Sequence, residues 1–298
     1  MKQTTRPFTI IGIGEILWDN LPAGRQLGGA PANFAFHAQA LGARGIAASC
    51  VGRDPDGEEI LQRLQSLGLS TEALAVDPDH PTGTVDVHLD AAGVPTFIIR
   101  ENVAWDFIPL TNELRNLAAS ADAICFGSLA QRGEVSRRTI QAVLDAAGPR
   151  CLRIFDINLR QHFYSRPIIE QSLRRSSVLK LNDGELPVVA RLLELEGDEA
   201  AVAGAFIDRY GMRLVALTRG DKGSTLFAPG SRHDHPGIRT TIADTVGAGD
   251  AFTAAVAVGL LKGQDLDQIN QRANRLAAYV CSQPGATPTV PAEVIGTA

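Results

Sequence analysis

The stretch DTVGAGDAFTAAVAVGLLKG, residues 244–263, has the composition of an anion-binding loop that leads into a helix. Gly247, Ala248 and Gly249 open a helix that is apolar on nearly all sides, which predicts that the helix is buried. The first N–H groups of a helix have no partner within it and lie at the positive end of its dipole. Small residues here let those groups converge on an anion.

Asp250 follows this loop at once. An aspartate at this place could simply cap the helix. However, a carboxylate beside an anion site repels a bound phosphate, so a chemical role is the better explanation. A base that takes the proton of a hydroxyl, while the N–H groups hold the transferring phosphoryl group, has such a role. The loop therefore predicts phosphoryl transfer.

Polar residues also follow several of the strands that we expect. Ligands of open α/β sheets bind outside the carboxyl ends of the strands. Each residue alone can end a strand or cap a helix, but together they indicate a site at one edge of the sheet. These residues are Glu15, Asp19, Asp156, Asn158, Arg160, Asn182, Asp183, Glu185, Thr218, Arg219 and Gly220.

Strand-like runs followed by helical patterns recur along the chain. The runs are continuously apolar, which is typical of strands buried on both faces of a parallel sheet. Their alternation with helices predicts an α/β fold, with a doubly wound and mostly parallel sheet flanked by helices. The expected strands are 8–15, 45–52, 122–129, 151–158, 177–183 and 213–220, and the expected helices are 31–41, 57–67, 134–147, 166–174 and 184–195.

Residues 82–109 break this rhythm. Apolar and polar residues alternate from Val85, a turn follows at 91–93, and a second extended run begins at Thr96. This pattern predicts a hairpin with one wet face. Residues 16–27 are also extended, and we expect the two segments to form a small antiparallel β lid. Because no linker or repeat is visible, residues 1–298 are interpreted as one domain.

Composition narrows the possible partners and the compartment. The chain of 298 residues has a formal net charge of −5, which argues against nucleic-acid binding, since that needs a basic surface. No apolar run approaches the roughly 20 residues of a membrane span, and the first residues lack the features of a signal peptide. The four scattered cysteines are interpreted as small core residues of a reducing compartment. We expect a cytoplasmic protein without a membrane partner.

Two stretches resemble the signatures of the ribokinase-like (PfkB) carbohydrate kinases. They are LGGAPANFAFHAQALG at 27–42 and DTVGAGDAF at 244–252, and the resemblance continues to GATPTVP at 285–291. Within that family, the segments GEILWDNLP, ENVAWDFIP, FDINLR and LKLNDGEL are most similar to bacterial fructokinases. The resemblance implies the ribokinase-like fold and transfer of the γ-phosphoryl group of ATP to a primary hydroxyl of a small sugar, with fructose as the expected sugar.

The resemblance also implies roles for single residues. Asp250 matches the catalytic base, and Gly247, Ala248 and Gly249 match the anion hole. Arg160 stands where a basic residue reaches the phosphate or the substrate. The residues expected to bind the sugar are Asp19, Gly28, Gly29, Asn33, Arg100, Asn102 and Asn158. The residues expected to bind the nucleotide are Asn182, Glu185, Thr218, Gly220, Gly223 and Asn274.

Elementary chemistry agrees with the sugar site. Gly28 and Gly29 have no Cβ, so the backbone can approach a polyhydroxylated ligand closely. Asn33 offers both a donor and an acceptor, which a hydroxyl group requires, although a capping amide is the alternative. Asp19 can accept hydrogen bonds from two adjacent hydroxyls.

The resemblance further implies ions and a partner. Asn182 and Glu185 form the N-x-x-E motif linked to Mg²⁺ and phosphate, so Glu185 is expected to act on Mg²⁺ indirectly. Some relatives hold a monovalent cation behind the anion hole, and Asp244 with the carbonyl of Val246 are the candidates for K⁺ here. Relatives often pair through lid strands, which protects the edges of the small sheet, so a homodimer is expected.

Other readings stay open at this point. The acceptor could be ribose, a nucleoside or 2-keto-3-deoxygluconate, whose carboxylate would need Arg100 or Arg160. A non-catalytic sugar or nucleotide sensor is the alternative from another class, but the Gly-Ala-Gly-Asp loop is intact. A nicotinamide dehydrogenase would need a glycine fingerprint that the chain lacks.

Several aromatic and histidine residues can be interpreted either as part of a site or as structural residues. Trp105 and Phe107 could form a sugar-stacking wall or the apolar underside of the lid. We expect His37, one helical turn after Asn33, to pack beneath the site. The HDH run at 233–235 is expected in a surface hairpin rather than a metal site, because adjacent residues of a strand point to opposite faces.

Overall fold

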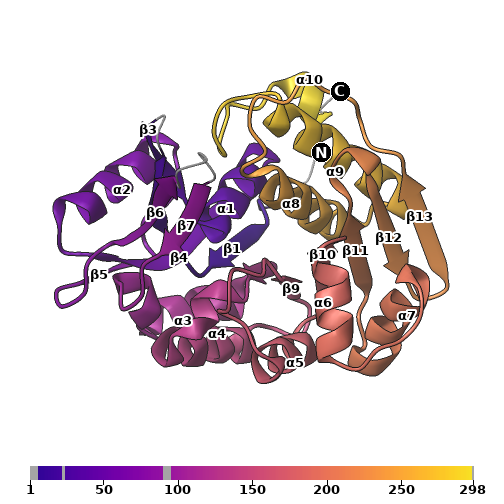
Figure 1. The fold of residues 1–298 in the computed structure, drawn as a ribbon, viewed down its shortest axis with the longest axis horizontal. Coiled ribbons are helices and arrows are strands. Elements are labelled where there is room, and N and C mark those ends of the chain that lie inside the picture. Colours follow the sequence, from indigo (N-terminus) through magenta and orange to yellow (C-terminus); the bar gives the residue numbers. More distant parts are fainter. Residues whose placement is uncertain (1–5, 22–23, 90–94, 297–298) are drawn as a thin grey trace.

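The computed structural model describes residues 6–21, 24–89 and 95–296, and it contains one large sheet and one small sheet (Figure 1). The turn expected at 91–93 lies outside the described residues. The large sheet has nine strands in the order β13-β12-β11-β10-β9-β8-β1-β4-β5. In chain order these are β1 (Thr9–Ile13), β4 (Arg44–Gly52), β5 (Leu74–Asp77), β8 (Ala123–Phe126), β9 (Leu152–Asp156), β10 (Val178–Asn182), β11 (Leu214–Thr218), β12 (Ser224–Ala228) and β13 (Ser231–His235).

The strands from β11 to β5 run parallel to their neighbours, and only β12 and β13 are antiparallel. The chain leaves β1 in one direction, toward β4 and β5, and later returns on its other side through β8. This reversal is the switch point of a doubly wound sheet, where ligands bind at the carboxyl ends of the strands. The predicted α/β architecture is therefore confirmed.

Helices cover both faces of the large sheet (Figure 1). Ile10 and Ile11 are adjacent in β1, so they point to opposite faces, and each belongs to a different core. Ile10 packs with Phe34 and Phe252, whereas Ile11 packs with Ile140. One face carries α1 (Ala30–Ala40), α8 (Ala248–Leu261) and α9 (Leu266–Cys281), and the other carries α3 (Asn112–Ser120), α4 (Glu134–Ala146), α5 (Arg166–Arg175), α6 (Glu185–Leu192) and α7 (Glu199–Tyr210).

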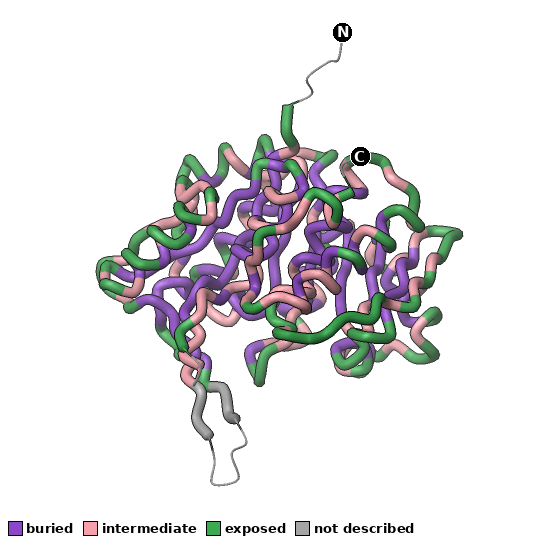
Figure 2. Tube along the Cα trace, turned by 90° about the horizontal axis from the view of Figure 1, so that it is seen from above, coloured by how far each residue is buried: buried purple, intermediate pink, exposed green. Residues whose placement is uncertain are grey.

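The buried segments lie in the interior of the molecule and the exposed ones lie around them (Figure 2). Helix α2 (Pro55–Ser66) packs against α1 and β4 through a third, smaller core, and the short helix α10 (Ala292–Ile295) lies against α9. Asp54 caps α2 by accepting a hydrogen bond from Gly57 N at 2.8 Å. Among the described helices, none is long and apolar enough to cross a membrane.

The small sheet is formed by the two segments in which a lid was expected, and we call it the lid sheet or lid. Its order is β3-β2-β6-β7, with β2 (Leu17–Leu21), β3 (Gly24–Gly28), β6 (Gly83–Leu89) and β7 (Pro95–Ile99). Two antiparallel hairpins are joined by the pair β2 and β6, which is parallel. The lid thus combines two segments that are far apart in the sequence.

The predicted second lid segment extends too far. Its strands end at Ile99, and a short 3₁₀ helix, Ala104–Phe107, turns back into the main body. Trp105 in this helix is fully buried, with the Arg132 guanidinium stacked 4.0 Å from the centre of its ring. Phe107 instead stacks on His80, with ring centres 3.6 Å apart. The hairpin of β12 and β13 carries the HDH run at the edge of the large sheet, where His235 Nδ1 accepts a hydrogen bond from Gly237 N.

Candidate active site

A cavity of about 670 Å³ lies where the lid meets the carboxyl ends of the central strands. Its walls come from the lid, from the first turns of α1 and α8, and from the segments after β1, β9 and β10. The cavity brings together most of the expected site residues. Those that line it are Asp19, Gly28, Gly29, Asn33, Asn158, Arg160, Asn182, Glu185, Val246, Gly247, Gly249 and Asp250.

Two glycines shape the lid side of this cavity. Gly29 precedes α1 with φ of 120°, a region that side chains other than glycine rarely adopt. A Cβ atom there would lie 2.5 Å from the carbonyl oxygen of Glu15. A Cβ atom on Gly28 would lie 2.3 Å from Asp19 Oδ2, so the Asp19 carboxylate rests directly on the glycine backbone.

Asp250 lies in the first turn of α8, and its carboxylate faces α1. Asn33 Nδ2 donates a hydrogen bond to Asp250 Oδ2 at 2.9 Å. Burial raises the pKa of Asp250 to about 6, helped by the negative charge of Asp156 and opposed by Asn33, Lys180 and Arg160. A carboxylate with this pKa is ionised at neutral pH and has gained basicity.

The loop before Asp250 depends on glycine. Gly247 adopts the left-handed conformation, with φ of 80°, and a Cβ atom there would lie 2.6 Å from Ala286 O. Ala248 N lies 3.4 Å from Thr245 O, at the long end of hydrogen bonding. Among the described residues, the N–H groups of Gly249 and Asp250 donate to no protein acceptor. These groups are therefore available to an anion.

His37 packs beneath this loop, as expected. Its Nε2 lies 2.9 Å from Ala286 O, and its ring is fully buried. Burial lowers the pKa of His37 to about 4, so the ring is neutral at physiological pH. Because Nε2 faces a carbonyl, it carries the proton and donates.

Glu15 is a deeply buried carboxyl group on the lid side of the central cavity. It follows β1 and is 3% exposed, and its Oε2 has no hydrogen-bond partner among the described residues. Burial raises the pKa of Glu15 to about 7 and that of the nearby Asp19 to about 6. In both cases the charge of Arg160 opposes the shift.

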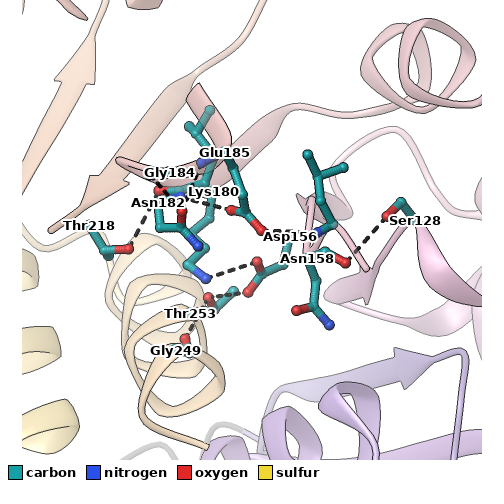
Figure 3. A network of polar contacts seen from close by, with 12 residues as sticks. Ser128, Asp156, Asn158, Lys180, Asn182, Gly184, Glu185, Thr218, Gly249 and Thr253 are labelled. Atoms are coloured by element: carbon teal, nitrogen blue, oxygen red, sulfur yellow. Dashed lines mark hydrogen bonds and ion pairs between the residues drawn. The ribbon is translucent and has the colours of Figure 1, made fainter. Parts of the chain in front are cut away.

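Beneath the α8 loop lies a charged network (Figure 3). Lys180 Nζ donates to Asp156 Oδ1 at 2.9 Å, and both side chains are about nine-tenths buried. Thr253 Oγ1 lies 2.8 Å from Asp156 Oδ2 and 2.9 Å from Gly249 O. The network connects the ends of β9 and β10 to the first turn of α8.

Asn182 and Glu185 form a folded turn after β10 (Figure 3). Asn182 Oδ1 accepts hydrogen bonds from the N–H groups of Gly184 and Glu185, both at 2.9 Å. The Glu185 carboxylate accepts from Asn182 N at 2.8 Å and from Leu159 N at 3.0 Å. The motif therefore fixes the loops after β9 and β10 in one arrangement.

The expected nucleotide residues beyond this motif lie off the central cavity. Gly223 ends a short 3₁₀ helix, Gly220–Lys222, with φ of 79°, and a Cβ atom there would lie 2.0 Å from His235 O. Thr218 ends β11 beside this turn. Asn274, on α9, is buried and donates through Nδ2 to Ser224 Oγ and to Asn270 O, both at 2.8 Å.

Two expected sugar ligands do not line the cavity. Arg100 is exposed and forms an ion pair with Asp86 on the lid at 2.9 Å. Asn102, with φ of 55°, lines a second cavity of about 580 Å³ together with Phe107 and Arg132. Arg160, by contrast, extends over the central cavity, with Nη1 donating to Leu159 O.

The Asp244 carboxylate is hydrogen-bonded to backbone N–H groups of two neighbouring segments. It accepts hydrogen bonds from Val246 N at 3.0 Å and from Gly285 N at 3.2 Å, and Val246 itself is exposed. Within the described residues, no group of three or more histidine, cysteine or acidic side chains is placed to hold a metal ion.

Comparison with known proteins now decides the family. The model of the pfkB family carbohydrate kinases matches residues 23–293, nearly the whole chain. The chain belongs to the PfkB family of carbohydrate kinases.

Relatives of this PfkB kinase share most of its length. An uncharacterized sugar kinase of Pyrococcus horikoshii is 32% identical over 270 residues, which cover 88% of this chain and 83% of the relative. A fructokinase of Salmonella typhimurium is 31% identical over 261 residues, which cover 83% of either chain.

Solved structures give the same result. The crystal structure of the Pyrococcus horikoshii protein has a TM-score of 0.82 and 30% identity, covering 95% of this chain and 94% of that one. A double mutant of the Vibrio cholerae fructokinase, with fructose, ADP and potassium bound, has a TM-score of 0.81 and 25% identity over 98% of both chains.

Sequence reasoning missed some residues of this PfkB kinase. Glu15 and Asp156 were recognised as polar strand ends, but no role was assigned to either. Lys180 was interpreted only as part of an apolar strand, although a lysine within a strand buried on both faces is itself an unusual feature. Thr253 looks like one more residue of a buried helix, and nothing in the sequence separates it from its neighbours.

Proposed function

We propose that this kinase transfers the γ-phosphoryl group of ATP to a primary hydroxyl of a small sugar, with fructose as the substrate. Support comes from the Salmonella typhimurium relative, which is named a fructokinase, and from the Vibrio cholerae structure with fructose and ADP. A second structure of the Pyrococcus horikoshii protein contains ATP.

The observation that carries the proposal is the hydrogen bond between Asn33 and Asp250. It joins the sugar signature to the phosphoryl-transfer loop inside one cavity. The cavity therefore offers hydroxyl-binding groups, a basic carboxylate and unpaired N–H groups side by side, which is the set that phosphorylation of a hydroxyl requires.

In the proposed reaction, Asp250 takes the proton of the sugar hydroxyl. The hydroxyl oxygen then forms a bond to the γ-phosphorus, in line with the bond that breaks between that phosphorus and the β–γ bridging oxygen. The electron pair of the broken bond leaves with ADP. The N–H groups of the α8 loop stabilise the charge on the transferred group, and the lid excludes water that would otherwise hydrolyse ATP.

The residues after β10 fit a Mg²⁺ ion that is held mainly by the nucleotide. Both Glu185 oxygens already accept backbone N–H groups, but each retains a lone pair. Mg²⁺ commonly binds through one carboxylate together with phosphates and waters, and when bound it neutralises phosphate charge. The role of Asn182 and Glu185 is to hold the two loops in place for that complex.

A sugar acid is the second candidate. Arg160 lines the cavity, and a guanidinium there suits the carboxylate of 2-keto-3-deoxygluconate. Arg100 is less suited, because it is already paired with Asp86. A nucleoside or ribose has no comparable feature in its favour.

A panel of substrates tests the proposal. Fructose, ribose, 2-keto-3-deoxygluconate and adenosine are each supplied with ATP and Mg²⁺, and ADP release is measured in a coupled assay. The Asp250→Asn variant, purified in the same way, reveals any contaminating kinase. We expect fructose to give the highest kcat/KM. If another acceptor gives a higher kcat/KM, that acceptor replaces fructose as the proposed substrate. If no acceptor causes ADP release, the kinase proposal is contradicted.

The K⁺ site and the homodimer also stay proposals. Asp244 and the Val246 carbonyl are the proposed K⁺ ligands, and the bound potassium of the Vibrio cholerae structure supports the choice of ion. Strands β3 and β7 form the edges of the lid sheet, and pairing along such edges would protect their unpaired backbone groups. Activity in K⁺ against Na⁺ and sedimentation equilibrium test these two proposals.

A further inference from the structure

Lys180 is a buried cation that lies against the α8 loop. A Cβ atom added to Gly249 would lie 3.2 Å from Lys180 Nζ, so the ammonium group lies directly against the first turn of α8. Lys180 also lines the central cavity. The ammonium group is therefore beside the N–H groups that we assign to the transferring phosphoryl group.

The surroundings of Lys180 hold it in one position (Figure 3). One N–H group of Lys180 Nζ donates a hydrogen bond to Asp156 Oδ1 at 2.9 Å, and the other two N–H groups have no acceptor among the described residues. Asp156 is itself fixed by Thr253, whose hydroxyl lies between Asp156 Oδ2 and Gly249 O. Within the described residues, Lys180 therefore has two unpaired N–H groups. Its hydrogen bond to the fixed Asp156 carboxylate orients them.

Lys180 keeps its charge in this environment. Desolvation lowers its pKa, but the charges of Asp156 and Glu185 outweigh that effect, and the pKa lies above the ordinary value of 10.5. A purely structural ion pair would explain the burial. However, it would not explain why the pair lies at the mouth of an anion-binding helix, since a buried pair is a costly way to stabilise a fold.

We propose that Lys180 is a catalytic residue, which binds the transferring phosphoryl group of ATP beside the N–H groups of Gly249 and Asp250. Asp156 and Thr253 are positioning residues that orient its ammonium group. This proposal rests on the proposed kinase function. The chain has no Walker A lysine, so a cation for the γ-phosphate must come from elsewhere in the fold, and Lys180 is placed to supply it.

The ammonium group neither gives nor takes a proton in the proposed reaction. Its positive charge stabilises the negative charge that gathers on the phosphoryl oxygens as the bond to ADP breaks. The interaction needs the γ-phosphate, so it is made with ATP and not with ADP. This difference separates the proposed role from a structural one.

The test compares three forms of the full-length chain. Lys180→Met alone would leave Asp156 as a buried, unpaired charge and could unfold the chain. The main variant is therefore the double replacement of Lys180→Met with Asp156→Asn, which removes both charges together. Lys262→Met, at the carboxyl end of α8 and away from the loop that opens this helix, is the control, and the wild-type chain is the reference.

Two measurements are made with Mg²⁺ present. Calorimetry gives the Kd of a non-hydrolysable ATP analogue and of ADP, and steady-state kinetics give kcat and the KM of the sugar. For the double variant we expect the affinity ratio of analogue to ADP to fall about tenfold. We also expect kcat to fall about 10²- to 10³-fold, with the sugar KM within threefold of wild type. The control should match the wild type.

An unchanged affinity ratio with kcat within threefold of the wild type would overturn the proposal. If the double variant does not fold by circular dichroism, a wild-type crystal with ADP and aluminium fluoride decides. Lys180 Nζ within hydrogen-bond distance of the fluoride supports the role, and a larger separation overturns it. The nucleotide measurement does not depend on the sugar, so it holds even if no acceptor in the panel is phosphorylated. Failure of the wild type to bind either nucleotide contradicts both proposals.

Discussion

The two walls of the central cavity satisfy their polar groups in different ways. On the lid side, Glu15 has a buried oxygen that finds no partner in the described part of the chain, and burial raises the pKa values of both Glu15 and Asp19. On the α8 side, Asp156, Lys180 and Thr253 are joined to one another by short hydrogen bonds. Among the described residues, the lid wall therefore leaves a buried acceptor without a donor, whereas the α8 wall leaves only donors unpaired.

This difference follows from what each wall is proposed to bind. A sugar presents neutral hydroxyls, which can satisfy carboxylates only after the ligand has arrived. A phosphoryl group brings several negative charges, so the groups that receive it work best when they are oriented beforehand. The unpaired acceptor of the lid wall costs stability in the free protein, and the hydrogen bonds among Asp156, Lys180 and Thr253 make the α8 wall rigid.

The largest expected effect concerns Asp250, which lies between the two walls. Replacing Asp250 with Asn removes the base but keeps the size of the side chain next to Asn33. We expect kcat to fall by about 10³- to 10⁴-fold, the upper range for general-base catalysis, while the Kd of ADP stays unchanged. Steady-state kinetics and calorimetry measure the two quantities. Turnover within tenfold of wild type would remove Asp250 from the base role.

Replacing Glu15 with Gln tests the cost of the lid wall. The pKa of Glu15 is about 7 in the folded chain against an ordinary value of 4.5. The contribution of Glu15 to the free energy of unfolding is therefore greatest below pH 4.5. It falls by about 3 kcal/mol as the pH rises through 7. We expect the variant to be more stable than wild type at pH 8, with the difference shrinking toward pH 5. Urea denaturation at both pH values measures it. An equal difference at both would contradict the buried acid.

Replacing Asp19 with Asn should act on sugar binding rather than on chemistry. A hydrogen bond to a charged acceptor is worth roughly 1.5–3 kcal/mol, so we expect the sugar KM to rise about 10- to 100-fold. The affinity for ADP should not change, because the α8 wall is untouched. If kcat falls and KM does not, the division between the two walls is wrong.

The smallest predicted effect is on pH dependence. The pKa of Asp250 is about 6, and only its ionised form can take a proton. We expect kcat/KM, which reports the pKa values of the free enzyme, to fall tenfold for each pH unit below about 6 and to be level above pH 7. Rate measurements from pH 5 to 8 on wild type and on Asp19→Asn check this. The acidic limb should persist in the variant, and its disappearance would assign the limb to the lid wall.

Much of the fold was predictable because its signals are local and repetitive. Continuous apolar runs predicted the parallel strands, and the helix expected at 31–41 is observed at Ala30–Ala40. The small residues at 28–29 and 247–249 predicted close backbone approaches, and the cavity lies beside them. Helix α3, helix α7 and strand β5 were missed, since short or weakly patterned segments depend on tertiary packing.

The parts of the site that escaped prediction are long-range. Lys180 and Thr253 are 73 positions apart, and only the folded chain brings both to Asp156. Arg100 was expected at the sugar because of its place after the lid strand. The structure pairs it with Asp86 across the hairpin instead, a contact that depends on strand register and not on residue type.

The segment at 285–286 has a consequence for the order in which the protein becomes active. Gly285 N donates a hydrogen bond to the Asp244 carboxylate, and Ala286 O accepts one from His37 Nε2. The backbone of Ala286 packs directly against Gly247. The support beneath the proposed phosphoryl-binding loop is thus made of residues that the ribosome delivers after every described strand and after α8. A nascent chain can build the lid and most of the large sheet well before this support exists. Competence to consume ATP should therefore arise only after residue 286 has been synthesised and has folded against Gly247.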